Sequence, residues 1–340
     1  MIDSFVLLAP ILLLGIIALL GFVGCLSKPD PPVAQLAIAP NSGPTTGGTK
    51  VVITSPGAAF AGSPTVTFGS SPDPTVNATQ VTVIDTNTMM AVTPAYPIAK
   101  PVNVTARYTG SSGTDFSGTL PQNSFFTYFS PVSHVQTALG SAGGGTSIQS
   151  PPLALQGGEL LLVTLQWGGT GTPALSGATV QSLPGGAYPW SGMKVQVFSG
   201  MNTVSGQVVV KATLSSASPV AWRLCVSAYD GADSVNPTYS PVASPDGNTG
   251  KALQTPAPIA ANAGDLIYSV AFAADAGGAF PGTTNALTPG TGFTAESGIG
   301  NPLVQDQQVV TAAGISATAT NTTANTNPRW WIFAVGVKAS

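Results

Sequence analysis

Hydrophobic residues in this 340-residue chain occur mainly in short runs separated by Gly, Pro, Ser and Asn. Runs such as VVIT at 51–54, QVVVKAT at 207–213 and WWIFAVGV at 330–337 are rich in β-branched and aromatic residues. Short runs of this composition between turn residues are typical of β-strands. No useful length of the C-terminal part has the 3.6-residue periodicity of an amphipathic helix. We therefore predict an all-β fold after the N-terminal segment.

The N-terminal segment is the exception to this pattern. Residues 5–24 are uncharged and mostly aliphatic, and a helix of that length covers about 30 Å, enough to cross a bilayer. The preceding MIDS contains Asp3 and no Lys or Arg, unlike a secretory signal. We predict a retained transmembrane helix at about 5–24 within a membrane anchor of residues 1–27, followed by a linker at 28–32.

Two alternatives for this segment stay open. The sequence FVGC, which ends at Cys25, resembles a bacterial lipobox. That resemblance implies that Cys25 is acylated and that residues 1–24 are removed. The third alternative is a simple cleaved signal.

Charged residues make up only 7% of the chain, against about 25% in a typical soluble domain. The ten Lys and Arg residues are scattered, and the net charge is -3, so no basic patch indicates nucleic-acid binding. A surface solvated by hydroxyl and amide groups is the pattern we associate with extracytoplasmic β proteins. We expect both β domains on the periplasmic or cell-surface side.

The first β domain is predicted at 33–130. Its turn and strand motifs lie at Pro40, Ser42 to Pro44, Gly47 to Thr49, Phe68-Gly69, Thr93-Pro94 and Phe126 to Tyr128. In this order they resemble the IPT/TIG family over about residues 33–129. The resemblance implies an immunoglobulin-like sandwich that serves as a spacer or interaction module in surface proteins and receptors, and it does not imply catalysis.

The second β domain is predicted at 131–340. The segments GGELLLVTLQW at 157–167 and AGDLIYSVAFA at 263–273 repeat one device, in which Gly and an acid, Glu159 or Asp265, precede an apolar run. This arrangement predicts a turn that enters a buried strand. The region loosely resembles jelly-roll modules of secreted bacterial and phage proteins, which implies a larger jelly-roll-like β-sandwich.

Few side chains suggest catalysis or metal binding. His134 is the only histidine, so a multi-histidine metal site is excluded, and we expect a linker residue at the domain junction. Asp230 and Asp233 are expected to form turns, as are Asp246 and Asn248, which are too few for a calcium site. We predict no catalytic, cofactor-binding or metal-binding residues and no cofactor.

Aromatic residues are the remaining candidates for a site. In the strand RWWIFAVGV both faces are apolar. Either both faces are buried, or Trp330 faces outward and contacts a sugar or a protein partner. Tyr188 and Trp190, in a loop rich in Gly and Pro, allow the same two interpretations. Tyr188, Trp190 and Trp330 are therefore candidate partner or glycan contacts, and Cys25 is a candidate lipidation site.

The combined pattern predicts a non-enzymatic, membrane-anchored bacterial protein with a structural or interaction role. We expect an accessory or scaffolding subunit of a larger membrane or envelope assembly, with a respiratory or photosynthetic complex as one setting. The alternative is a glycan-binding surface lipoprotein or adhesin. A carboxylate-dependent glycosidase comes third, and it would need two carboxylates about 5 to 9 Å apart in a cleft.

Overall fold

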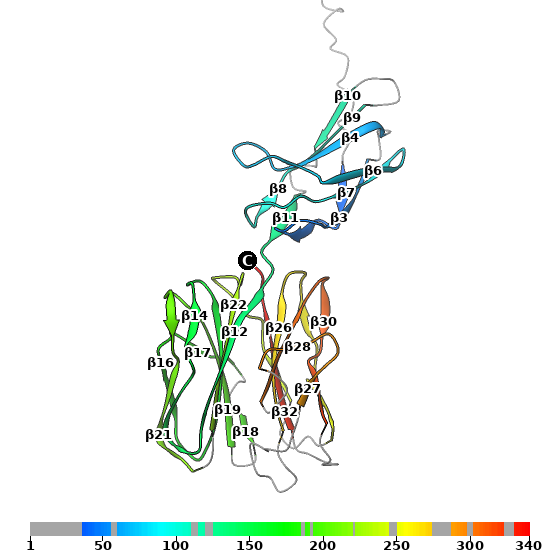
Figure 1. Cartoon of the computed structure of the whole chain (residues 1–340). Helices are drawn as coiled ribbons and strands as arrows, with labels where there is room; N and C mark the ends of the chain where they lie inside the picture. Colours follow the sequence, from blue (N-terminus) through cyan, green and yellow to red (C-terminus); the bar gives the residue numbers. More distant parts are fainter. Residues whose placement is uncertain are drawn as a thin grey trace, which may run out of the picture. The chain divides into compact units, whose positions relative to one another are not determined.

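The computed structural model contains β-strands joined by turns and loops in every part of the chain that it describes (Figure 1). This confirms the all-β prediction. Within the described residues, no helix has the length and apolar character needed to cross a membrane. The predicted span at 5–24 and Cys25 lie outside the described residues. Those residues are 36–55, 60–109, 115–119, 125–184, 188–190, 193–219, 222–244, 250–273, 287–297, 302–322 and 330–340, with the backbone alone described at 61, 108–109, 115–119 and 188–190.

The described chain divides into two compact units, and the first comprises residues 36–39, 50–91 and 103–125. It contains two four-stranded sheets. Strand β3 shows how the sequence builds them, because its alternating pattern buries Val51 and Ile53 and exposes their neighbours. One sheet has the order β1 (Ala37–Ala39), β3 (Lys50–Thr54), β7 (Thr88–Val92), β6 (Gln80–Asp85), and the other the order β10 (Asp115–Thr119), β9 (Val104–Thr109), β4 (Ala61–Phe68), β5 (Val76–Asn77).

The second unit comprises residues 40–49, 92–102 and 126–340. Its first sheet places β11 (Phe126–Phe129) between β2 (Ser42–Pro44) and β8 (Pro101–Val102). Tyr128 is buried there, where its ring stacks on Tyr96 with centroids 4.8 Å apart. The Tyr128 hydroxyl donates a hydrogen bond to the carbonyl oxygen of Pro94 (3.1 Å). Tyr128 thus holds the segment that contains Pro94 and Tyr96 in place.

The rest of the second unit consists of two sets of sheets, which we call module A (residues 133–230) and module B (residues 231–340). The main sheet of module A has the order β12 (Ser133–Ala142), β22 (Trp222–Asp230), β15 (Leu160–Gly168), β19 (Met193–Met201), β17 (Gln181–Ser182), and β18 (Tyr188–Trp190) also pairs with β19. Two smaller sheets complete it, β13 (Gly145–Gln149), β21 (Lys211–Ser218), β16 (Pro173–Ser176), and β14 (Leu153–Leu155), β20 (Gly206–Val208).

Module B repeats the strand order of module A. Its main sheet has the order β23 (Val242–Ala243), β32 (Trp330–Val337), β26 (Leu266–Ala273), β29 (Leu303–Gln308), β28 (Thr294–Ala295). Its smaller sheets are β24 (Ala252–Gln254), β31 (Thr318–Asn321), β27 (Leu287–Pro289), and β25 (Ile259–Ala261), β30 (Ala313–Ile315).

The registers of the central strands match between the modules. Leu160, the first residue of β15, pairs with Tyr229 and Met201, whereas Leu266, the first residue of β26, pairs with Val337 and Gln308. The turns before these strands are also equivalent. The Gly158 N–H donates to Asn202 O, as the Gly264 N–H donates to Val309 O. The Gly-acid motif, which occurs at 158–159 and again at 264–265, therefore occupies the same position in two copies of one topology.

The main sheets of both modules are buried on both faces. One face of each lies in a core shared by the modules, which includes Val197 and Cys225 from module A and Phe272 and Trp331 from module B. The opposite faces lie in separate cores, one inside each module. This double burial explains why β15, β26 and β32 are almost entirely apolar rather than alternating.

Candidate functional site

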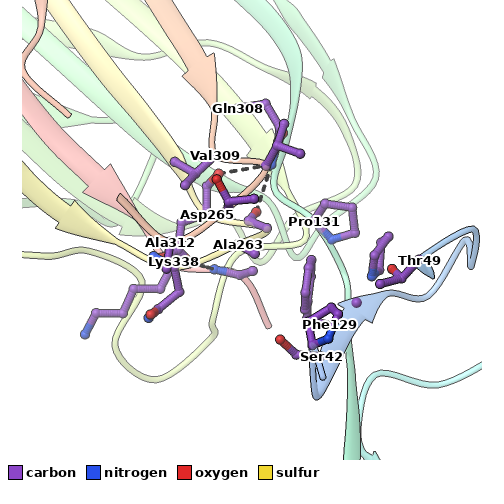
Figure 2. Close-up of a pocket in the computed structure, with 18 of the residues that line it drawn as sticks. Ser42, Thr49, Phe129, Pro131, Ala263, Asp265, Gln308, Val309, Ala312 and Lys338 are labelled. Carbon is purple, nitrogen blue, oxygen red and sulfur yellow. Dashed lines mark hydrogen bonds between the residues drawn. The ribbon is translucent and has the colours of Figure 1, made fainter. Parts of the chain in front are cut away.

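A pocket of about 1000 Å³ lies in the second unit (Figure 2). One wall comes from residues 40–49 together with Phe129 and Pro131, and the facing wall comes from turns of module B. Figure 2 shows Ser42, Thr49 and Phe129 on the first wall. Val310, which is 81% exposed, also lines the pocket.

Asp265 organises the module B wall of this pocket. Its Oδ2 accepts hydrogen bonds from the Tyr239 hydroxyl (2.6 Å) and the Asn262 N–H (2.7 Å), and its Oδ1 accepts one from the Ala339 N–H (2.8 Å). Lys338 lies over the Tyr239 ring, with Nζ 4.9 Å from the ring centroid. Burial and the nearby Asp265 carboxylate raise the pKa of Tyr239 to about 12. The wall is thus a connected polar framework with its carboxylate already engaged.

The first wall depends on glycine. Gly47 and Gly48 have positive φ angles of 76° and 84°, which glycine adopts without steric cost. The Gly48 N–H donates to the carbonyl oxygen of Thr93 (2.9 Å), and the Thr93 N–H donates to that of Thr49 (2.9 Å). The loop is therefore pinned by backbone hydrogen bonds.

A second group of polar side chains lies where the two modules meet, away from the residues that line the pocket. His134 Nδ1 is 2.5 Å from Glu296 Oε2, and ligand atoms of His134, Glu296 and Asp306 all lie within 4.8 Å of one another. His134 Nε2 is 2.8 Å from Thr137 Oγ1, which is 2.8 Å from Ser227 Oγ. We call His134, Glu296 and Asp306 the carboxylate–histidine cluster.

A β-bulge brings His134 and Thr137 onto one face. His134 pairs with Tyr229 and Thr137 pairs with Ser227, and the register between β12 and β22 shifts between His134 and Gln136. Residues three apart in a regular strand point to opposite faces, but the extra residue of a bulge restores the same face. The bulge therefore aims the imidazole of His134 along the chain of hydroxyl groups.

The module B half of the cluster follows from strand register. Thr294 of β28 pairs with Asp306, and the Glu296 N–H donates to Val304 O (2.9 Å). Residues 304 and 306 share one face of β29, and Val304 belongs to the core shared by the modules. Glu296 and Asp306 accordingly lie on the face that meets module A.

The cluster is electrostatically unusual because its groups are partly or fully buried. The side chains of His134 and Glu296 are 20% and 14% exposed, and Asp306 is 6% exposed. Burial, and next the negative charge of Glu296, raise the pKa of Asp306 to about 7. Burial lowers the pKa of His134, against the opposing effect of Glu296. These shifts favour neutral forms of Asp306 and His134 beside the carboxylate of Glu296.

His134 corrects one expectation from the sequence. We expected a linker residue, but His134 belongs to strand β12 and contacts a carboxylate that is 162 positions away in the chain. No local motif joins His134 to Glu296 or Asp306. Only the packing of the modules brings them together.

The predicted contact residues have different outcomes. Trp330 is 7% exposed and lies in the core of module B, so the first alternative, burial, describes it. Tyr188 and Trp190 were expected in a loop, but their backbone forms strand β18, which pairs with β19. Their side chains, and all of Cys25, lie outside the described residues. Asp246 and Asn248 also lie outside them.

Asp233 forms a turn, as expected, whereas Asp230 is the last residue of strand β22 and borders that turn. Asp233 Oδ1 accepts hydrogen bonds from the N–H groups of Val235 (2.7 Å) and Asn236 (3.1 Å). Asp230 accepts one from the N–H of Gly231 (2.8 Å). The hydrogen bonds from Val235 and Asn236 lower the pKa of Asp233. Asp233 therefore acts as a turn-forming carboxylate.

Comparison with known proteins identifies one domain. The family described as IPT/TIG domain matches residues 36–128, and no curated protein matches the chain. A crystal structure of a structural genomics protein of unknown function from Bacteroides thetaiotaomicron is 16% identical, with a TM-score of 0.22. The match covers 53% of this chain and 40% of that chain. A likeness at that score does not define a shared fold. The chain therefore carries an immunoglobulin-like IPT/TIG domain at residues 36–128.

Proposed function

We propose that this protein is a non-enzymatic interaction protein that holds a partner at an extracytoplasmic membrane surface. The IPT/TIG match at residues 36–128 carries this proposal, because domains of this kind serve as spacers and interaction modules. The doubly buried sheets of modules A and B support it, since they provide a rigid body behind a contact surface. The finer proposal is an accessory or scaffolding subunit of a larger membrane or envelope assembly.

The membrane part of the proposal rests on the sequence of residues 5–24. Their length and lack of charge suit a single transmembrane helix, which would keep the β domains close to other membrane proteins. This arrangement raises the effective concentration of the protein near a membrane partner. A weak contact surface is then sufficient for stable assembly.

The pocket in Figure 2 is the contact site that we favour. Its walls are fixed by Asp265 and by the loop at 47–48. Val310 is one of the lining residues, and it is 81% exposed. An exposed valine on a rigid rim is suited to packing against an apolar side chain of a partner protein. We propose that a subunit of the same assembly inserts such a side chain.

Site-specific photo-crosslinking tests this contact in membranes of cells that make the protein. A benzoylphenylalanine at position 310 should capture a partner, which mass spectrometry of the crosslinked band would identify. The matched control is position 204, because Val204 is also exposed (60%) and lies after β19, at the turn of module A equivalent to that of Val310. It does not line the pocket.

Solubilisation in mild detergent, native gels and mass spectrometry test the assembly as a whole. The proposal expects a complex larger than the free chain, which retains Met1 and crosslinks at 310 much more strongly than at 204. A free monomer with an acylated Cys25 and no Met1 would contradict the membrane-subunit proposal. Equal crosslinking at both positions would reject the pocket as the contact site.

A further inference from the structure

The carboxylate–histidine cluster offers three ligand groups from different parts of the second unit. His134 comes from β12 of module A, whereas Glu296 follows β28 and Asp306 belongs to β29 of module B. One imidazole nitrogen and two carboxylate oxygens within 4.8 Å of one another are a donor set that zinc accepts. Ligand atoms around a tetrahedral zinc ion lie about 3.3 Å apart, given metal–ligand distances of about 2.0 Å. Small side-chain movements would therefore bring these three groups into position.

A second observation points to a missing ligand at the same place. The Oδ2 atom of Asp306 is buried and completes no hydrogen bond of good geometry among the described residues. The same is true of the buried Tyr229 hydroxyl, which nevertheless lies close enough to Asp306 to lower the pKa of that carboxyl. The Tyr229 ring contacts the ring of His134, with centroids 5.5 Å apart. Buried polar atoms are normally paired, because burial without a hydrogen-bond partner costs the full desolvation of the atom. A cation at the cluster would supply the partner for Asp306.

His134 is already oriented as a ligand. If Nδ1 binds the metal, Nε2 carries the proton and donates to Thr137 Oγ1, which donates in turn to Ser227 Oγ. A hydrogen bond to the second ring nitrogen fixes the tautomer and the ring orientation in metal sites. The β-bulge at 134–136 produces this alignment. Bulges commonly re-aim side chains at functional sites.

The carboxylate of Asp306 has no counterpart at the equivalent position of module A. Asp306 pairs with Tyr268 of β26, and the equivalent position in module A is Ser199, which pairs with Leu162 of β15. Formation of the strand at this position therefore does not require an acid. The acid occurs in the one copy that faces His134.

We propose that His134, Glu296 and Asp306 bind one zinc ion, with water in the fourth position, and that the ion links module A to module B. Zinc suits this set better than calcium or magnesium, because imidazole nitrogen is a ligand that zinc accepts, whereas the two harder ions prefer oxygen ligands and calcium takes six to eight of them. The partial exposure of His134 and Glu296 leaves the site accessible from solvent.

The test uses the full chain after treatment with EDTA and dialysis. Titration with ZnCl₂ should show one saturable site by calorimetry, and a rise in unfolding temperature should accompany binding, because the ion binds the folded state. CoCl₂ should give the visible absorption bands of a tetrahedral cobalt site. MgCl₂ and CaCl₂ at the same concentrations should have no effect.

Three variants and one matched control assign the site. H134A, E296Q and D306N should each weaken zinc binding at least about tenfold and abolish the cobalt bands. D230N should bind zinc like the original protein, because Asp230 is an exposed carboxylate at the end of the strand that carries Tyr229. Circular dichroism checks that each variant is folded.

The cobalt spectrum of the original chain keeps the proposal falsifiable if a variant does not fold. Absence of a saturable zinc site and of tetrahedral cobalt bands would overturn it. Equal zinc binding by all four variants would also overturn it, because the ion would then sit elsewhere. Failure of zinc binding would leave the crosslinking result at Val310 unaffected.

Discussion

Substitution of Glu159 should destabilise module A by an amount that depends on pH. Its Oε1 accepts a hydrogen bond from the N–H of Gln156 (2.5 Å), and its Oε2 accepts from the N–H of Gly157 (2.9 Å) and Nδ2 of Asn202 (2.9 Å). The residue is 4% exposed. Removal of the carboxylate therefore leaves several donors in the turn before β15 without their acceptor.

The size of the loss in the free energy of unfolding depends on whether water or another acceptor can replace each hydrogen bond to Glu159. A hydrogen bond to a charged group contributes about 1.5–3 kcal/mol. Gln156 and Gly157 are exposed, so water can reach them, whereas Asn202 is buried and keeps a bond to Val204 O (2.8 Å). We therefore expect a loss of about 3 kcal/mol in the free energy of unfolding for E159A and about 2 kcal/mol for E159Q, which keeps one acceptor.

The sign of the pH dependence is set by the pKa of Glu159. Burial raises this pKa, but the hydrogen bonds from Asn202, Gln156 and Gly157 outweigh burial and lower it below its ordinary value of 4.5. The unfolded chain then takes up this proton at a higher pH than the folded chain does. The contribution of Glu159 is present above pH 4.5 and is lost as the pH falls through its folded pKa.

Urea unfolding followed by tryptophan fluorescence measures this difference at pH values from neutral to acid, because Trp167 and Trp222 lie in the core of module A. The difference in the free energy of unfolding between the original chain and E159Q should become smaller at acid pH. D230N, which changes an exposed carboxylate, should stay within about 0.5 kcal/mol. A loss below about 0.5 kcal/mol for E159Q, or a difference between the two chains that does not change with pH, would show that the Glu159 carboxylate does not stabilise the turn.

Three further predictions concern packing and reactivity. G264A should lower the free energy of unfolding by about 3 kcal/mol, because residue 264 has a φ of +94° and the new methyl group would overlap the Phe129 ring. G158A should lower it by about 1 kcal/mol, because residue 158 has a φ of +100° but open space around it. Equal losses for the two variants in thermal unfolding would contradict this. W331A should cost about 3–5 kcal/mol, because Trp331 fills the core between the modules; a loss below 1 kcal/mol in urea would argue against that packing. Burial raises the pKa of Cys225 to about 12, so its peptide should carry no maleimide in mass spectra unless the chain is first unfolded; labelling of the folded chain would show that the core opens.

The strands were largely predictable from the sequence because their signals are local. The IPT/TIG motifs at 40–49, 68–69 and 126–128 depend on turn residues and on strand alternation, and the family match confirms them. The Gly-acid device at 158–159 and 264–265 likewise predicts turns before buried strands, and the hydrogen bonds of Glu159 and Asp265 confirm both turns.

The apolar character of both faces of β32 was also visible, but its cause was not. The sequence did not indicate what covers the second face, and the structure places module A there. A strand buried on both faces has the same sequence pattern whatever covers it. The presence of two copies of one topology is evident from the strand orders of the sheets and not from the sequence pattern of one strand.

The all-β class, the IPT/TIG domain and the turns could be predicted from the sequence, because these depend on residues that are neighbours in the chain. The burial of Trp330 and the meeting of His134 with Glu296 and Asp306 follow from the packing of the folded chain. These outcomes depend on sheet packing and on a one-residue bulge, and a register shift of one residue reverses the direction of a side chain without leaving a signature in composition.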